Sequence, residues 1–396
     1  MVKAGAAGSA AARGTLRREV AVSVGRRRGG PRLVCQAQIN APVPGIASDR
    51  RPRVSVIIPC YNYGRFLPEA VKSALSQEGV EPEVIIVDDV STDDSAAVAE
   101  RLADSDPRVT VIRHDCNRGH VVTFNTGYAM AGGEFIVRLD ADDLLTPGSL
   151  ARSVALFDAY PRIGLVYGHP SHFTTDIPPK ARTTVRGWTV WSGEDWVAER
   201  CRTAVNCITT PEAMIRASVM RPAGGLSTAL RYAQDMEMWL RTAAVSDVGR
   251  VDGPDQAFHR DHADSMSATD GAGKLLDLVE RRTVFETLFS GLGSQMRLAT
   301  ELHRTARAAL ADEALADACR AYDRGRTGVV NVQSYIDFAL DTCPEARQQP
   351  HWRALQRRQR LGVRLAPIPP FFTATVVRRR LRWEISYRRW QRTGLW

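Results

Sequence analysis

Short runs rich in valine and isoleucine alternate with helix-like segments from Arg53 onward, and this alternation constrains the fold more than any other feature of the sequence. The apolar runs are VSVIIP (54–59), EVIIVDD (83–89), VTVIRHD (109–115) and EFIVRLDADD (134–143), separated by FLPEAVKSALSQ, DDSAAVAERLAD and HVVTFNTGYAMA. An order of this kind builds βαβ units. We therefore expect an α/β fold, Rossmann-like, with a mostly parallel sheet.

Each apolar run ends in polar residues, namely PCYNY, DDVSTD, HDCNRG and DADD. In open α/β sheets the ligand binds beyond the carboxyl ends of the strands. These four segments should therefore converge on one binding crevice.

The chain divides into four predicted regions. Residues 1–51, rich in Ala, Gly, Arg and Pro, are expected to form a disordered basic arm, although a transit peptide would look similar. Residues 52–270 should form the α/β domain, in which PEAMIRASVM (211–220) and DMEMWLRTAAV (235–245) look helical and SHFTTDIPPKARTTVRGW (171–188) looks like a mobile loop. Residues 271–365 carry helical periodicity, and residues 366–396 form an arginine- and aromatic-rich tail.

The composition indicates more about the cellular environment of the protein than about its function. The net charge of +9 arises largely from arginines at the two ends of the chain. Seven scattered cysteines with no CxxC pair fit a reducing, cytoplasmic environment better than a disulfide framework or a zinc site. No stretch approaches the roughly 20 apolar residues that a membrane-spanning helix needs.

The acidic run DADD is the main candidate for chemistry. Asp140 and Asp142 are two residues apart at the end of a strand-like run, so an extended backbone would point both to one face. Two carboxylates about 4 Å apart repel by roughly 4 kcal/mol at an effective dielectric near 20, which a bound cation would relieve. Oxygen ligands select Mg²⁺ or Mn²⁺. A solvated acidic turn that caps the next helix, with Asp143 near its N-terminus, fits the same residues.

Five ordered motifs extend the interpretation: VSVIIPCYNYGRFLPEAVKSALSQ, EVIIVDDVSTDDS, NRGHVVTFNTGYAMAGGEFIVRLDADD, QDMEMWLR and HRDHADSMS. With them, residues 53–267 resemble the inverting glycosyltransferases of family 2, which have the GT-A fold. The resemblance implies that Pro59, Tyr61 and Asn62 line a pocket for the base of a nucleoside-diphosphate sugar, such as a UDP-sugar. It also implies that Asp89 accepts a hydrogen bond from that base, which suits an acceptor-only carboxylate.

The remaining site residues are implied by the same resemblance. Asp140 would contact the donor, and either Asp142 or Asp143 would hold the metal. Asp235 resembles the catalytic base, although it also fits a simple N-cap of the following helix. Arg260 and His262 belong to a late loop that folds over the diphosphate, where His259 stands in place of a more usual aromatic residue.

Three positions depart from the family pattern. Val90 replaces a glycine, and since a β-branched residue disfavours positive φ, we expect that turn to be shaped differently. Phe124 replaces an arginine that can reach the diphosphate, which leaves Arg118, Arg138 or Arg260 as substitutes. Gln234 replaces the glutamate that often precedes the base.

The resemblance implies an enzyme that moves a sugar to a hydroxyl acceptor, either a carbohydrate, a lipid-linked molecule or a small molecule, in cell-surface glycan, glycolipid or glycosylated-metabolite synthesis. A sugar-nucleotide nucleotidyltransferase and a catalytically silent sugar-nucleotide-binding module are the alternatives. The tail VVRRRLRWEISYRRWQRTGLW could contact an anionic membrane surface peripherally, at the inner face of the membrane, or remain solvated. Nucleic acid is not expected as a partner.

Overall fold

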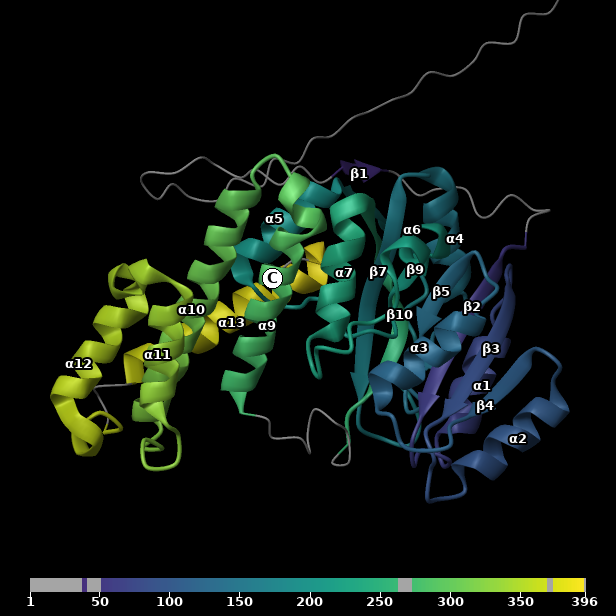
Figure 1. The fold of residues 1–396 in the computed structure, drawn as a ribbon, viewed down its shortest axis with the longest axis horizontal. Helices are drawn as coiled ribbons and strands as arrows, with labels where there is room; N and C mark the ends of the chain where they lie inside the picture. Colours follow the sequence, from purple (N-terminus) through teal and green to yellow (C-terminus); the bar gives the residue numbers. More distant parts are fainter. Residues whose placement is uncertain (1–37, 41–50, 263–272, 369–372, 395–396) are drawn as a thin grey trace, which may run out of the picture.

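The computed structural model describes residues 38–40, 51–262, 273–368 and 373–394. One twisted sheet carries helices on both faces, and the C-terminal helices gather beside it (Figure 1). The strands are β1 (Gln38–Asn40), β2 (Arg53–Cys60), β3 (Glu81–Asp88), β4 (Val109–Arg113), β5 (Phe135–Arg138), β6 (Leu144–Leu145), β7 (Ile163–Phe173), β8 (Gly187–Trp191), β9 (Met214–Arg216) and β10 (Asp247–Arg260).

The strand order is β1-β8-β10-β7-β9-β5-β2-β3-β4, and β6 pairs with β10. The four strands β4, β3, β2 and β5 are parallel, whereas the other half of the sheet is mixed. Because β2 lies between β3 and β5, the chain leaves β2 in one direction and later returns on its other side. The carboxyl end of β2 is therefore a topological switch point, where α/β sheets bind their ligands.

Side chains of β2 show how the sheet is enclosed. Val54, Val56 and Ile58 pack into one hydrophobic cluster together with residues of α1 (Leu67–Leu75), α2 (Ser95–Ser105) and α4 (Ser149–Ala159). Ile57 faces the opposite cluster, with α3 (His120–Met130), α5 (Gly193–Thr203) and α7 (Gln234–Val245). This alternation is the period of two expected of a strand that is buried on both faces.

Helix α3 lies unusually close to the sheet because of one glycine. A Cβ atom at Gly127 would stand 2.6 Å from a methyl group of Ile57. Any larger residue would push α3 away from β2, and with it His120 at the start of the helix.

The C-terminal helices share the core of the α/β domain. They are α9 (Lys274–Ser290), α10 (Ala299–Asp323), α11 (Val332–Thr342), α12 (Pro350–Leu365) and α13 (Thr373–Thr393). The short helix α6 (Ala217–Ala223) belongs to the α/β domain. Trp196 and Trp239 of the α/β domain belong to the same cluster as Leu278, Phe285 and Leu310. None of the helices in these ranges has both the length and the apolar character that crossing a bilayer requires.

The last part of α13 docks on the sheet rather than remaining a separate tail. Trp390 is buried and donates a hydrogen bond from Nε1 to the carbonyl of Cys207, 3.1 Å away. The Tyr167 hydroxyl of β7 donates to the carbonyl of Gly394 at 3.0 Å, and Arg250 of β10 donates to the carbonyl of Gln391 at 3.1 Å.

The structure confirms the predicted α/β architecture with a helical C-terminal region and corrects several details. Residues 38–40, inside the predicted disordered arm, form β1 and pair with β8, while most of that arm lies outside the described residues. The segment predicted as a helix from 211 contains strand β9, wedged antiparallel between β5 and β7. The predicted loop 171–188 begins inside β7 and ends inside β8. In each case a neighbouring strand supplies backbone partners that outweigh local propensity.

Candidate functional site

The loops after β2 and β3 are joined by Asn62. Its Oδ1 accepts hydrogen bonds from the backbone N–H groups of Thr92 (2.7 Å) and Asp93 (3.3 Å), and its own N–H donates to Ser91. Asn62 has a φ of 60°, which asparagine tolerates better than most residues. Tyr61 beside it is 45% exposed, and Pro59 is half-buried. An aromatic face is therefore open to solvent at the switch point.

Asp89 is buried and held by three donors. Its Oδ1 accepts from the backbone N–H of Arg118 (2.8 Å) and lies 2.7 Å from Nδ1 of His114, and its Oδ2 accepts from the N–H of Gly119 (2.8 Å). Burial alone would raise the pKa of Asp89, but these hydrogen bonds outweigh it and hold the pKa below its ordinary value. The carboxylate is ionised at neutral pH, and Oδ2 keeps one lone pair for a further donor.

Residues 140–143 form a turn, because the N–H of Asp143 donates to the carbonyl of Asp140 at 3.0 Å. The expectation of an extended backbone through Asp142 is therefore wrong, since β5 already ends at Arg138. Asp140 is one-third exposed and pairs with Arg138, whose Nε lies 3.0 Å from its Oδ1. Burial and the charge of Asp140 raise the pKa of Asp142, so the two carboxylates are electrostatic neighbours despite the turn.

Asp142 and Asp143 each face a histidine from the end of β10. Asp142 Oδ2 lies 2.8 Å from Nε2 of His262, and the Asp142 side chain is 14% exposed. Asp143 is fully buried, with Oδ2 3.0 Å from Nδ1 of His259 and Oδ1 accepting from the N–H of Arg260. Burial alone would lower the pKa of His259, but Asp143 outweighs it and raises that pKa to about 9.

Asp142 and His262 fit a divalent metal better than Asp143 does. Nδ1 of His262 is buried and has no hydrogen-bond partner among the described residues, so this ring is not fully satisfied within the protein. A carboxylate and an imidazole are ligand types that Mn²⁺ accepts. Asp143, in contrast, already has a partner on each oxygen.

Arg260 and Arg118, predicted to contact the donor, both have partners within the protein. Arg260 is buried between the rings of Phe66 and Phe173, and it donates to the carbonyl of Asp142 at 3.0 Å and to Glu69 at 2.9 Å. Its observed role is to hold the backbone of the acidic turn. The Arg118 guanidinium pairs with exposed Asp115 at 2.7 Å, while its backbone N–H binds Asp89.

Asp235 lies in the first turn of α7 and is half-buried. Its Oδ2 accepts from Nδ2 of Asn206 at 2.8 Å, and its Oδ1 accepts from the N–H of Met236 at 2.7 Å. Burial raises the pKa of Asp235 to about 6, and the charge of Arg138 opposes the rise. Arg138 therefore links Asp235 electrostatically to Asp140 at the acidic turn.

Three side chains around Asp235 were not found from the sequence alone. Asn206 donates to the carboxylate, and His120 lies 3.0 Å from the side-chain nitrogen of Gln234. Glu280 of α9 accepts from the N–H groups of Arg231 (3.1 Å), Tyr232 (2.7 Å) and Ala233 (2.9 Å), directly before α7. His120 lies inside one of the five motifs that carry the family resemblance. Asn206 and Glu280 lie in segments where no motif was recognised.

The three departures from the family pattern have different outcomes. Val90 takes a φ of 62°, so the turn keeps the left-handed conformation of a glycine and the expectation of a different shape is wrong. The hydrogen bonds of the adjoining Asp89 and Ser91 hold this backbone in place. Phe124 is buried and stacks on Tyr128, so its ring belongs to the core. Gln234 contacts His120.

The sequence of this domain also matches a family model. Residues 55–221 match the model described as Glycosyl transferase family 2. The chain carries a family 2 glycosyltransferase domain.

Relatives of this family 2 domain include proteins of polysaccharide synthesis. The chain is 40% identical over 113 residues to the succinoglycan biosynthesis protein ExoO of Rhizobium meliloti, an alignment covering 28% of this chain and 32% of the relative. It is 34% identical over 119 residues to the glycosyltransferase GlyG of Streptococcus pneumoniae, covering 29% and 40%. The alignments thus span only about a third of the relatives' lengths.

A solved structure supports the fold assignment of the family 2 domain. The crystal structure of S. aureus TarS matches with a TM-score of 0.51 and 15% identity, over 77% of this chain and 55% of that one. At this identity the match concerns the fold alone. Together with the sheet order, it identifies the α/β domain as GT-A.

Proposed function

We propose that the protein is an inverting glycosyltransferase that moves a sugar from a nucleoside-diphosphate donor, a UDP-sugar, to a hydroxyl group of a carbohydrate, lipid-linked or small-molecule acceptor. The observation that carries the proposal is the position of Asp235. It is a half-buried carboxylate with a pKa raised to about 6, coupled through Arg138 to the acidic turn at the carboxyl end of β5. A base near the operating pH beside a metal-type turn is what such a transfer needs.

In this proposal the loops after β2 and β3 bind the nucleoside. Tyr61 offers an exposed ring for stacking, which is worth roughly 1–3 kcal/mol per base in nucleic-acid complexes. Asp89, kept ionised by its three donors, accepts from an imide N–H of the base. Pro59 and Asn62 shape the pocket, and Asp140 contacts the donor.

Asp142 and His262 would hold Mg²⁺ or Mn²⁺ on the diphosphate, with Mn²⁺ favoured by the imidazole. The ion would neutralise the charge of the departing nucleoside diphosphate. Asp143 supports the turn from inside, and Arg260 holds its backbone. Of the two carboxylates that the sequence left undecided, we therefore assign the metal to Asp142.

Asp235 acts on the acceptor. Its carboxylate takes the proton of the acceptor hydroxyl while that oxygen forms the new bond to the anomeric carbon and the bond to the diphosphate breaks on the opposite side. The attack from the face opposite the leaving group inverts the anomeric centre. Asn206 fixes the orientation of the carboxylate during this step.

The proposal is tested by Asp235→Asn in the full chain. Sugar transfer from a panel of UDP-sugars with Mn²⁺ should fall by on the order of 10²- to 10⁴-fold, the usual contribution of a general base. UDP binding, measured by calorimetry, should stay within about twofold, since Asp235 does not contact the nucleotide in this proposal. Asp195→Asn is a matched control, because Asp195 is also a half-buried carboxylate in the first turn of a helix.

The outcomes separate the proposal from its two alternatives. Release of pyrophosphate from a nucleoside triphosphate and a sugar phosphate would indicate a nucleotidyltransferase. UDP binding with no transfer to any acceptor would indicate a silent binding module. Normal transfer by Asp235→Asn would place the base elsewhere.

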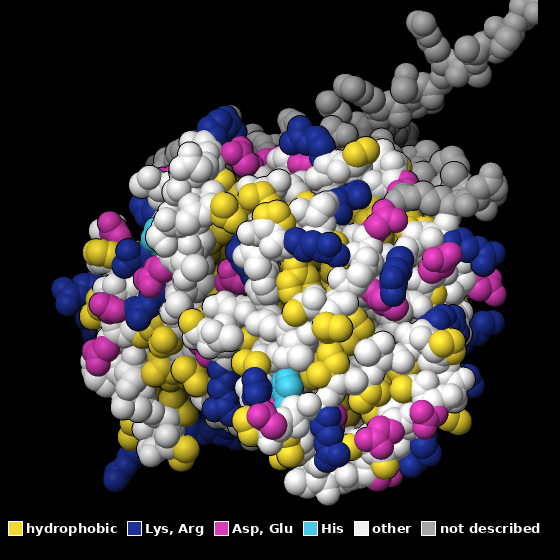
Figure 2. Space-filling model, turned by 45° about the vertical axis from the view of Figure 1, so that its right-hand side comes forward, with side chains coloured by type: hydrophobic (Ala, Val, Ile, Leu, Met, Phe, Trp, Pro, Cys, Tyr) yellow, Lys and Arg dark blue, Asp and Glu magenta, His cyan; other side chains and the backbone are white. Residues whose placement is uncertain are grey.

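We also propose that α13 contacts an anionic membrane surface, which would suit a lipid-linked acceptor. Its exposed side chains combine cations with apolar groups: Arg378, Arg380, Arg382, Arg388, Val377, Leu381, Trp383 and Ile385. Such a surface fits anionic headgroups by charge and the acyl boundary by its aromatic and aliphatic groups. Figure 2, in which the right-hand side of Figure 1 comes forward, shows basic and acidic side chains interspersed on that side of the molecule.

A further inference from the structure

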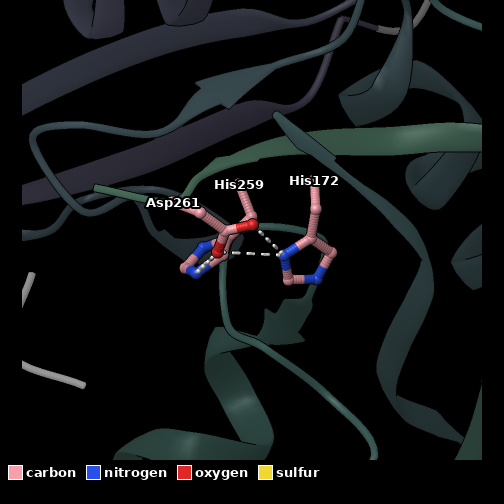
Figure 3. A group of neighbouring side chains, drawn as sticks. All are labelled: His172, His259 and Asp261. Carbon is pink, nitrogen blue, oxygen red and sulfur yellow. Dashed lines mark hydrogen bonds and ion pairs between the residues drawn. The ribbon is translucent and has the colours of Figure 1, made fainter. Parts of the chain in front are cut away.

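The ends of β7 and β10 bring together three side chains that the proposed transfer does not use. His172 and His259 are direct partners in the parallel ladder between these strands. The N–H of Asp261 donates to the carbonyl of Phe173 at 2.8 Å, so the pairing continues past His259. Residues two apart on an extended backbone face the same side, which places Asp261 beside His259. Figure 3 shows the two rings and the carboxylate converging.

The separations of these groups are close to those of a metal site. Nδ1 of His172 lies 3.2 Å from Asp261 Oδ2, and Nε2 of His259 lies 3.8 Å from Asp261 Oδ1. One ligand atom from each of the three residues can be chosen so that all lie within 4.8 Å of one another. A tetrahedral ion with bonds of about 2.1 Å needs ligand atoms about 3.4 Å apart. Small rotations of the side chains would satisfy this requirement.

A buried carboxylate orients one of the rings. Asp143 Oδ2 accepts the Nδ1 proton of His259, which leaves Nε2 directed toward Asp261, where a metal ion would displace the Nε2 proton. Metal-binding histidines commonly have such a carboxylate on their other nitrogen, because it fixes the tautomer and strengthens the ligand. Asp143 is itself held by the N–H of Arg260 and is fully buried. His259 is therefore preorganised as a ligand.

The cluster of His172, His259 and Asp261 is open to solvent on one side. His172 is 44% exposed and Asp261 is 49% exposed, while His259 is more enclosed. Three protein ligands with access to solvent leave a coordination position for water. Two imidazoles and one carboxylate suit zinc and other late transition metals, whereas Mg²⁺ prefers oxygen ligands only.

We propose that His172, His259 and Asp261 form a second metal site, which binds Zn²⁺ separately from the donor's metal. That this site is a second one rests on the proposed donor site at Asp142 and His262. Binding of Zn²⁺ by His172, His259 and Asp261 does not depend on the proposed function. A bound ion would tie the end of β7 to the end of β10 and fix Asp261, the residue immediately before His262. The second site would thereby stabilise the segment that carries a ligand of the first.

The test is calorimetric titration of Zn²⁺ into metal-stripped full-length protein, with His172→Ala and Asp142→Ala compared to the wild type. The wild type and Asp142→Ala should bind Zn²⁺ with the same affinity at this site, and His172→Ala should bind it more than about 10-fold more weakly. Mn²⁺-dependent UDP binding should show the reverse pattern, lost in Asp142→Ala and kept in His172→Ala. Replacement of Zn²⁺ by Co²⁺ should give visible absorption bands in the wild type that His172→Ala lacks.

His351→Ala is the matched control, because His351 makes an equivalent partly exposed pair with Asp312 in the helical region. It should bind Zn²⁺ like the wild type. Thermal unfolding without metal should be the same for His172→Ala and the wild type, which shows that the variant folds.

Equal Zn²⁺ affinity in His172→Ala and the wild type would overturn the proposal. Loss of Zn²⁺ binding in Asp142→Ala would also overturn it, since there would then be one shared site. If UDP binding fails while Zn²⁺ binding behaves as described, only the proposed function is refuted.

Discussion

The protonation of Asp235 sets the expected pH dependence of the proposed transfer. Burial raises its pKa to about 6, and only the ionised form can accept a proton. The rate at saturating donor and acceptor should therefore be level above pH 7 and fall about tenfold per pH unit well below pH 6. Initial rates between pH 5 and pH 8.5 measure this, and a profile without a break between pH 5.5 and 6.5 would contradict the assignment.

The raised pKa of Asp235 affects folding stability in the opposite direction to the rate: as the pH rises, the rate increases and the stability decreases. A carboxylic acid whose pKa is raised in the folded state binds its proton more tightly there, so its contribution to stability is lost as the pH rises through about 6. Asp235→Asn removes that cost. The variant should therefore unfold at no lower a temperature than the wild type at pH 8, which separates loss of chemistry from loss of fold.

At single residues, the geometry of the acidic turn and the packing of Arg260 could not be predicted from the sequence. Asp140, Asp142 and Asp143 stand at the predicted end of a strand, but they form a turn because Asp143 bonds back to Asp140. Arg260 is enclosed by two aromatic rings from distant segments, while its contact with the diphosphate remains a prediction. Neither outcome is encoded locally, because each depends on partners that the fold brings together from far along the chain.

Among the elements, α9 reaches the proposed base through Glu280. Its carboxylate accepts the three N–H groups that precede α7, where an anion is also favoured by the helix dipole. Glu280→Gln keeps the size but loses the charge and one acceptor oxygen. We expect kcat to fall between about 10- and 100-fold through displacement of Asp235, with little change in UDP affinity.

Kinetics of Glu280→Gln beside Glu286→Gln, an exposed neighbour on the same helix, would test this positioning role. The control should be unchanged. A positioning role also predicts a shifted break in the pH profile of Glu280→Gln, which loss of stability alone would not produce. If kcat and the profile both match the wild type, α9 supports the fold but not the site.

Elements with strong local patterns were predicted well, and those that depend on a partner were not. The runs at β2 and β3 and the amphipathic segments at α1 and α2 lie close to their predicted positions. Strand β9 has three residues inside a helix-like pattern, and it exists because the edges of β5 and β7 are both available to it. Periodicity cannot reveal a strand of this length.

For the whole molecule, the charge and aromatic content of α13 predict salt-sensitive binding to membranes. Vesicles containing phosphatidylglycerol should sediment the protein at low salt, whereas pure phosphatidylcholine should not, since each basic side chain near an anionic surface contributes about 1 kcal/mol. Arg382→Glu should weaken binding several-fold, and Arg101→Glu on α2 should not. Equal binding to both kinds of vesicle would contradict an electrostatic contact.

The overall architecture links regions that the sequence suggested were separate. The predicted boundary near residue 270 has no counterpart in the core, because Trp196 and Trp239 pack in one cluster with Leu278 and Phe285. The assignment of residues 271–365 to a separate helical C-terminal region remains a prediction from helical periodicity. Removing α9 and α10 would expose the tryptophans of the α/β domain, so the two regions should unfold together.

The docking of α13 on the sheet has a consequence for synthesis on the ribosome. The Tyr167 hydroxyl finds its partner 227 residues later, at Gly394. At translation speeds of roughly 5–20 residues per second, that partner emerges roughly 10–45 s after Tyr167. Until then the Tyr167 hydroxyl lacks this acceptor, and Arg250, once it has been made, lacks the carbonyl of Gln391. The segment that covers this part of the sheet is thus made long after the sheet itself, so a chaperone would have access to the uncovered part during that interval.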